Sequence, residues 1–172
     1  MTGVQTCALP IYQNLEIIFC DNESTDNSLQ IARTLKEAKY PQLIIETAPN
    51  IYKYSWEEPV NKALSISTGD YFTIVGADDY LDKDYVKNFM SVISAAPDKI
   101  FVFQSVLRGV DAEEKFLSDI SHSYKNLEEF KKLLFEKCPV NTPTVVYNKK
   151  LYELGLIDWQ SEKWLGANDY NL

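Results

Sequence analysis

The sequence predicts an α/β fold in which a mostly parallel sheet is flanked by helices. Short apolar runs typical of buried strands alternate along the chain with segments whose apolar residues recur at helical spacing. Clusters of Asp, Asn and Ser follow several of these runs, as expected where parallel strands reach the ligand-binding edge of a sheet. The 172 residues are 45% hydrophobic and 24% charged, which suits one globular domain with a real core.

The first eleven residues differ in character from the rest of the chain. Residues 1–11 (MTGVQTCALPI) look like an in-frame translation of a sequencing-library adaptor, so we exclude them from the fold prediction. Residues 12–172 then form one partial domain. We expect the native N-terminus of this domain to be missing.

The first predicted strand is Leu15–Cys20, and it leads into a dense cluster of polar residues from Asp21 to Ser28. The helix that follows has Leu29, Ala32, Leu35 and Ala38 at helical spacing. Ser24, Thr25 and Asp26 are all good helix N-caps, so capping is the favoured role for them. Asp21 stands at the end of the strand and is the better candidate to touch a ligand.

The next predicted elements are a short strand at Leu43–Glu46 and a helix that begins near Trp56, with Pro59 in its first turn. Asn61 lies within this helix, where it is either exposed or faces a ligand cleft. A buried strand at Tyr71–Val75 follows.

Two adjacent carboxylates, Asp78 and Asp79, come directly after that strand. Like charges side by side repel each other unless protons or a cation offset them. A hard divalent cation with oxygen ligands is a natural partner, and it could in turn hold a phosphate. On these two residues alone, solvated side chains or a turn cap remain equally good interpretations.

The remaining elements continue the alternation of strands and helices. They are a helix from Tyr85 capped by Asp82 or Asp84, a strand at Ile100–Leu107, a polar loop at 111–124, a helix from Asn126 to Lys137, a strand at Thr144–Tyr147, and a short helix at Lys149–Leu154 stopped by Gly155.

Composition excludes several other classes of protein. A net charge of −8 argues against a general nucleic-acid binder. The cysteines Cys7, Cys20 and Cys138 are scattered, which argues against a zinc site or a disulfide scaffold and fits a reducing cytoplasm. The single histidine, His122, lies between two serines and is predicted to be in a surface loop. No apolar run approaches the length of a membrane span.

Taken in order, the polar motifs resemble those of the family 2 glycosyltransferases, which have the GT-A fold and use nucleotide-diphosphate sugars. The resemblance extends over residues 12–172 and implies a domain truncated at both ends, without the family's first strand before residue 12 and without the helix that would follow Asp169. The matching segments are Asp21-Asn-Glu-Ser-Thr-Asp26 for Asp-Asp-Gly-Ser-Thr-Asp, Asn61 with Ser67–Tyr71, Gly76-Ala-Asp-Asp79 for the metal motif Asp-Ala-Asp-Asp, Asn141–Pro143 on the acceptor side, and Asn168–Leu172 for Glu-Asp-Tyr-Asp-Leu.

The resemblance implies a role for each matching residue. Asp21 would accept a hydrogen bond from the donor base, expected to be uracil N3–H, and Asn61 would lie in the donor site. Asp78 would bind Mn²⁺ or Mg²⁺ with Asp79 in support. Asp169 would be the catalytic base, and a single base without a covalent intermediate implies inversion at the anomeric carbon.

The resemblance also implies partners and a setting. The donor would be a UDP-linked sugar and the acceptor a sugar or a lipid-linked sugar. The relatives build cell-surface polysaccharide or glycolipid, so we expect the protein in the cytoplasm or at the inner face of the membrane.

Departures from the family pattern keep alternatives open. Gly76 replaces the first metal-motif aspartate, Asn22 replaces an Asp, and Asn168 replaces the Glu beside the base. A catalytically silent nucleotide-sugar-binding domain, or an inactive fragment of the same fold, is the first alternative. A phosphotransfer or nucleotidyl-transfer enzyme is the second, but the lysine or Gly-rich loop that it needs at the first strand is not visible.

Overall fold

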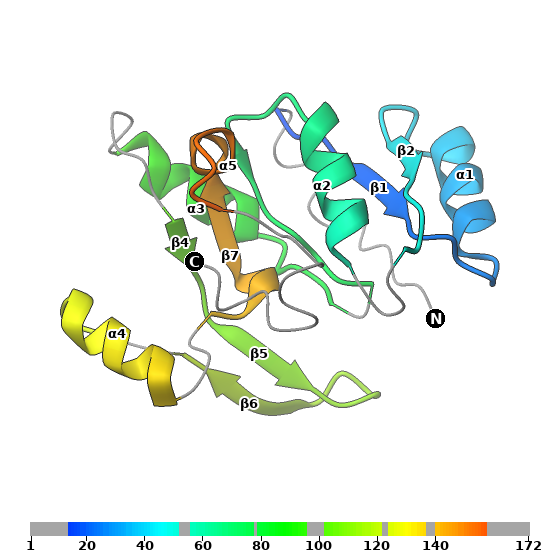
Figure 1. Cartoon of the computed structure of the whole chain (residues 1–172). Coiled ribbons are helices and arrows are strands. Elements are labelled where there is room, and N and C mark those ends of the chain that lie inside the picture. The colour runs from blue at the N-terminus through cyan, green and yellow to red at the C-terminus, as the bar shows by residue number, and fades with distance from the viewer. Residues whose placement is uncertain are drawn as a thin grey trace.

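The computed structural model describes residues 14–51, 56–77, 79–95, 102–121, 124–136 and 140–157 (Figure 1). Helices and strands alternate up to residue 104, as predicted, and two more strands then follow before the next helix. The helices are α1 (Ser28–Ala38), α2 (Glu57–Ile66), α3 (Tyr85–Ser94), α4 (Leu127–Glu136) and α5 (Lys149–Glu153), with a 3₁₀ turn η1 (Thr142–Thr144). The strands are β1 (Ile18–Asp21), β2 (Ile44–Thr47), β3 (Tyr71–Phe72), β4 (Val102–Gln104), β5 (Leu107–Val110), β6 (Phe116–Ile120) and β7 (Val145–Asn148).

The first half of the described chain is a β–α–β unit. Strands β1 and β2 pair in parallel with Ile18 opposite Ile44 and Asp21 opposite Thr47. Such a pairing needs a crossover, and α1 supplies it, lying beside the two strands (Figure 1). Helix α2 follows β2 and packs against β1. The apolar periodicity of α1 therefore predicted its position correctly, and Ala32 is its buried residue.

The second sheet has the strand order β3–β7–β4. Strand β7 is antiparallel to both of its neighbours, so β3 and β4 run in the same direction. Helix α3 connects these two strands, and ring contacts of Phe89 with Tyr85 and Phe103 join the helix to β4. All four residues of β7 are buried, as suits the middle strand of a sheet.

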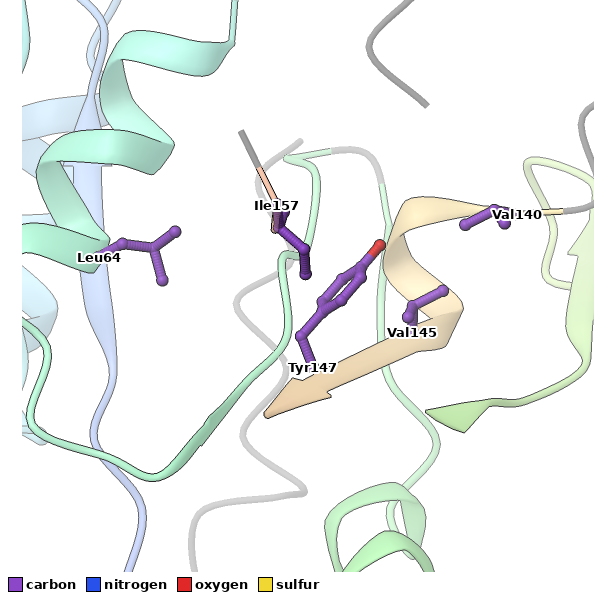
Figure 2. Packing of buried hydrophobic residues seen from close by; sticks show 5 residues of the cluster. All are labelled: Leu64, Val140, Val145, Tyr147 and Ile157. Atoms are coloured by element: carbon purple, nitrogen blue, oxygen red, sulfur yellow. The ribbon is translucent and has the colours of Figure 1, made fainter. Parts of the chain in front are cut away.

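A cluster of buried side chains joins the two halves. It consists of Leu64 on α2 together with Val140, Val145, Tyr147 and Ile157 (Figure 2). The ring of Phe72 stacks on that of Tyr147 with 5.2 Å between the centroids. Helix α2 and the second sheet thus share one buried hydrophobic cluster, which contains Leu64 and Tyr147.

The α/β class is confirmed, and the sheet pairing is mixed. Among the described strands only β1 and β2 are parallel, while β7 pairs antiparallel with both neighbours and β5 with β6. The predicted helices at 85, 126 and 149 are all present, and Asn126 caps α4 by accepting the Glu129 N–H at 3.0 Å. Gly155 ends α5 at a φ of 68°, a conformation that favours glycine.

The predicted five-residue strand at Tyr71–Val75 is wrong in its length, because β3 covers only Tyr71 and Phe72. Beyond Phe72, the hydroxyl of Thr73 donates to the carbonyl of Val145 at 2.8 Å, so a side chain makes the contact to β7 there. Val75 is 41% exposed and is not the end of a buried strand.

The segment from 100 to 124 also differs from its prediction. The single strand expected at Ile100–Leu107 is divided into β4 and β5, and the expected polar loop contains β6. Strands β5 and β6 form an antiparallel hairpin, which lies with α4 to one side of the remaining elements (Figure 1). Asp111 shapes the turn, because its Oδ1 accepts the N–H groups of Glu113 and Lys115.

Candidate functional site

Asp21 ends β1 and is 5% exposed. Its Oδ2 accepts the N–H of Ser24 at 3.1 Å. Its Oδ1 is buried and has no hydrogen-bond partner among the described residues. An unsatisfied buried acceptor typically costs about 1–3 kcal/mol, so such an atom in a native fold calls for an explanation. Asp21 thus has one carboxylate oxygen whose hydrogen-bonding capacity is unused among the described residues.

Cys20 precedes Asp21 and is half-buried. Burial raises the pKa of its thiol, and the nearby Glu46 carboxylate adds to this effect. A thiol with a raised pKa stays protonated near neutral pH and is a poor nucleophile. Cys20 therefore has the properties of a strand residue and not of a reactive group.

The segment that follows β2 is attached to the end of β1 at two points. The N–H of Ala48 donates to the carbonyl of Asp21 at 2.8 Å. The N–H of Asn50 donates to Oε2 of Glu23 at 3.1 Å, across 27 residues of sequence. Glu23 has a φ of 54°, in the left-handed region that residues with a Cβ rarely adopt.

Of the predicted capping residues 24–26, Asp26 bonds to the first residue of α1, although it is not the residue directly before the helix. The residue before α1 is Asn27, and its side chain makes no capping bond. Asp26 Oδ1 instead accepts the N–H of Ser28 at 2.9 Å. The hydrogen bonds from Ser28 lower the pKa of the exposed Asp26 carboxyl. Asp26 thus stabilises the start of α1.

Asn61 lies in α2, within two turns of its start, and is half-buried. Because α2 packs against β1, the helix that carries Asn61 is adjacent to the strand that carries Asp21. The acidic residues Glu57 and Glu58 occupy the first turn, where the helix dipole favours negative charge. Glu57 is 2% exposed, so the beginning of α2 is well buried.

Asp79 follows β3 and is half-buried. Its N–H donates to the carbonyl of Gly76 at 3.2 Å, a contact typical of a tight turn. Asp78, the predicted metal ligand, lies outside the described residues, as do Asp169 and His122. Within the described ranges no three His, Cys, Asp or Glu side chains are grouped so that they could hold a metal. The metal site therefore stays a prediction that depends on Asp78.

The predicted acceptor-side segment is joined to α3 and to the residue after β3 by a network of hydroxyl groups. The hydroxyl oxygens of Thr73 and Tyr85 lie 3.1 Å apart. Tyr85 also donates to the carbonyl of Pro143 at 3.3 Å, and Thr73 donates to Val145. Burial raises the pKa of Tyr85, so its hydroxyl stays protonated and able to donate.

The structure thus brings Asp21 together with the segment after β2. Sequence reasoning missed Glu23, Asn50 and the Thr73–Tyr85 pair. The available signal for Glu23 was its position, where the motif that this segment resembles has a glycine. Thr73 and Tyr85 gave no comparable signal, because their contacts join residues distant in sequence.

Comparison with known proteins gives one family and several relatives. A family profile described as "Glycosyl transferase family 2" matches residues 5–155. Over 77 residues the chain is 32% identical to the Escherichia coli UDP-Glc:alpha-D-GlcNAc-diphosphoundecaprenol beta-1,3-glucosyltransferase WfaP, covering 45% of this chain and 29% of that protein. An uncharacterized glycosyltransferase of Haemophilus influenzae is 30% identical over 94 residues, covering 51% of this chain and 35% of that protein. The chain therefore spans about a third of the length of these relatives.

A solved structure shows the same fold. The chain superimposes on the S. aureus TarS 1-349 structure in complex with UDP with a TM-score of 0.65 and 21% sequence identity. The match covers 91% of this chain and 44% of TarS 1-349. At this level of identity the likeness concerns the fold, which is the predicted α/β glycosyltransferase type.

Proposed function

Because the chain belongs to glycosyl transferase family 2, we propose that it binds a UDP-linked sugar and serves the transfer of that sugar to an acceptor hydroxyl. The setting we propose is the synthesis of cell-surface polysaccharide or glycolipid. WfaP, by its name, uses UDP-Glc and a diphosphoundecaprenol-linked acceptor, and TarS was solved with UDP. Both similarities support a UDP-linked donor.

The observation that carries the proposal is the free acceptor atom of Asp21. The Oδ2 atom of Asp21 already accepts the Ser24 N–H, and the buried Oδ1 has no partner among the described residues. Uracil presents a single imide N–H between two carbonyl groups, so one acceptor atom satisfies it. Guanine presents two neighbouring N–H donors that suit both oxygens of one carboxylate. The available chemistry at Asp21 therefore favours uracil.

The proposal assigns the remaining steps to residues by resemblance. Asp78, with Asp79 in support, would hold Mn²⁺ or Mg²⁺, for which carboxylate oxygens are suitable ligands. Such an ion supplies positive charge against the diphosphate that leaves. Asp169 would accept the proton of the acceptor hydroxyl as the oxygen attacks the anomeric carbon, with inversion at that carbon.

The nucleotide role can be tested by calorimetric titration of UDP into the chain and into Asp21→Asn. The amide offers one acceptor oxygen where two N–H groups compete, so one of them loses its partner. Hydrogen bonds to charged groups are worth roughly 1.5–3 kcal/mol, so we expect Kd to rise by about 10- to 150-fold. N3-methyl-UDP lacks the N3–H donor, so it should bind the parent chain weakly. Its Kd should be the same for the parent chain and for Asp21→Asn.

Glu37→Gln provides the matched control, because it removes one negative charge from an exposed position on α1. It should bind UDP like the parent chain. Equal affinity of Asp21→Asn and the parent chain for UDP would contradict the assigned role of Asp21.

An assay of UDP release distinguishes an enzyme from the main alternative, a catalytically silent nucleotide-sugar-binding domain. We expect release of UDP from a UDP-sugar in the presence of Mn²⁺, with loss of this activity on chelation of the metal and in Asp78→Ala. Binding of UDP without any turnover favours the silent domain, for which Gly76 in the metal motif is the supporting observation. Activity that persists without metal would exclude the metal role.

A further inference from the structure

Glu23 combines an unfavourable backbone conformation with a long-range hydrogen bond. Its φ of 54° places it in the left-handed region, which costs an L-residue free energy that glycine does not lose. The motif that this segment resembles has glycine here. Glu23 is exposed, so hydrophobic burial does not offset that cost. Such strain in a native structure persists only where surrounding contacts maintain it.

The contact that Glu23 makes lies over the end of β1. Its Oε2 accepts the N–H of Asn50, while the carbonyl of Asp21 accepts the N–H of Ala48. These two bonds attach the residues after β2 to both sides of the turn that carries Asp21. Ala48 is 3% exposed, so the attached segment is packed against the fold beside the end of β1.

Glycine at position 23 would relax the backbone but would remove the carboxylate that accepts the Asn50 N–H. Strain relief and the hydrogen bond to Asn50 are therefore mutually exclusive at this position. We propose that Glu23 is a positioning residue of the nucleotide site, whose carboxylate holds the segment Ala48–Asn50 against the end of β1. This inference rests on the proposed nucleotide-binding function.

A merely structural role and a positioning role predict different results. If Glu23 served stability alone, its removal would lower the melting temperature. A positioning role at a strained residue predicts instead that its replacement by glycine weakens UDP binding without lowering the melting temperature. The variant Glu23→Gly should melt at the same temperature as the parent chain or up to about 4 °C higher, because backbone strain is removed.

The experiment compares Glu23→Gly, Glu23→Gln and the parent chain by thermal unfolding, by UDP titration and by amide hydrogen exchange at Asn50. In Glu23→Gly the Asn50 amide should exchange faster. Its Kd for UDP should rise by about 3- to 10-fold, since the segment must now be ordered on binding. Glu23→Gln keeps an oxygen that accepts the Asn50 N–H, so it should bind UDP within about twofold of the parent chain.

Three results would overturn the positioning role while leaving the proposed function intact. They are unchanged UDP affinity in Glu23→Gly, a lowered melting temperature in that variant, and equally weak binding by Glu23→Gln. Failure of the parent chain to bind UDP would instead overturn the proposed function, and the positioning role with it.

Discussion

Truncation of Leu64 to alanine tests whether the contact between α2 and the second sheet stabilises the fold. Leu64 is 5% exposed and packs in the cluster around Tyr147 (Figure 2). The change removes three buried carbon atoms, each worth about 0.8 kcal/mol in transfer from water, and leaves a cavity that adds to the loss. We therefore expect the free energy of unfolding to fall by about 2.5–4 kcal/mol. Urea denaturation followed by circular dichroism measures this difference.

Leu154→Ala is the matched control, because the same three carbons are removed from a residue that is 64% exposed. Its effect should stay within about 0.5 kcal/mol, as for most surface substitutions. A loss below about 1 kcal/mol for Leu64→Ala, or equal losses in the two variants, would refute the reasoning that this cluster joins α2 to β7.

Two further predictions concern polar contacts. Tyr85→Phe removes the hydroxyl that contacts Thr73 and Pro143 and should lower the free energy of unfolding by about 0.5–1.5 kcal/mol in thermal denaturation, whereas Tyr124→Phe, at an exposed position, should have little effect. Equal effects of the two changes would argue against the network. Arg108 binds Asp119 through two hydrogen bonds and lowers the pKa of that carboxyl below its ordinary 3.8. Because the pKa is lower in the folded chain, the associated stability is present above the ordinary value and is lost as the pH falls through the folded value. An NMR titration should give a midpoint below 3.8 for Asp119, and Arg108→Gln should return it to the ordinary value; an unchanged midpoint would contradict the assignment.

The elements that the sequence predicted well are those whose signals are local. Helix α1 has clear apolar periodicity, α4 has Asn126 as its cap, and α5 ends at Gly155. Each signal lies within a few residues of the element that it marks. The resemblance to family 2 glycosyltransferases likewise rested on short motifs in order, and the family match over residues 5–155 confirms it.

The elements that were predicted wrongly depend on contacts between distant residues. Strand β6 was expected to be a loop because Asp111–Tyr124 is polar, yet Phe116–Ile120 becomes a strand by pairing with β5. Propensity for strands is easily overridden by such pairing. The apolar run at Tyr71–Val75 was read as a strand throughout, but Thr73 contacts β7 through its side chain.

Part of the candidate site could likewise be predicted from local sequence, and part depends on contacts between distant residues. The position of Asp21 at the end of a parallel strand could be predicted from the apolar run before it. The conformation of Glu23 and its bond to Asn50 could not be predicted, because they depend on where the segment after β2 lies in space. Asp78 and Asp169 lie outside the described residues, so their roles stay predictions.

We expect the hairpin of β5 and β6 to open separately from the rest of the fold. All five residues of β6 are exposed, with Phe116 at 61% and Leu117 at 62%, and the strand pairs with β5 alone among the described strands. A two-stranded hairpin with little buried surface is marginally stable by itself. The hairpin should therefore be a separate cooperative unit of low local stability, which opens many times for each opening of the buried strand β7.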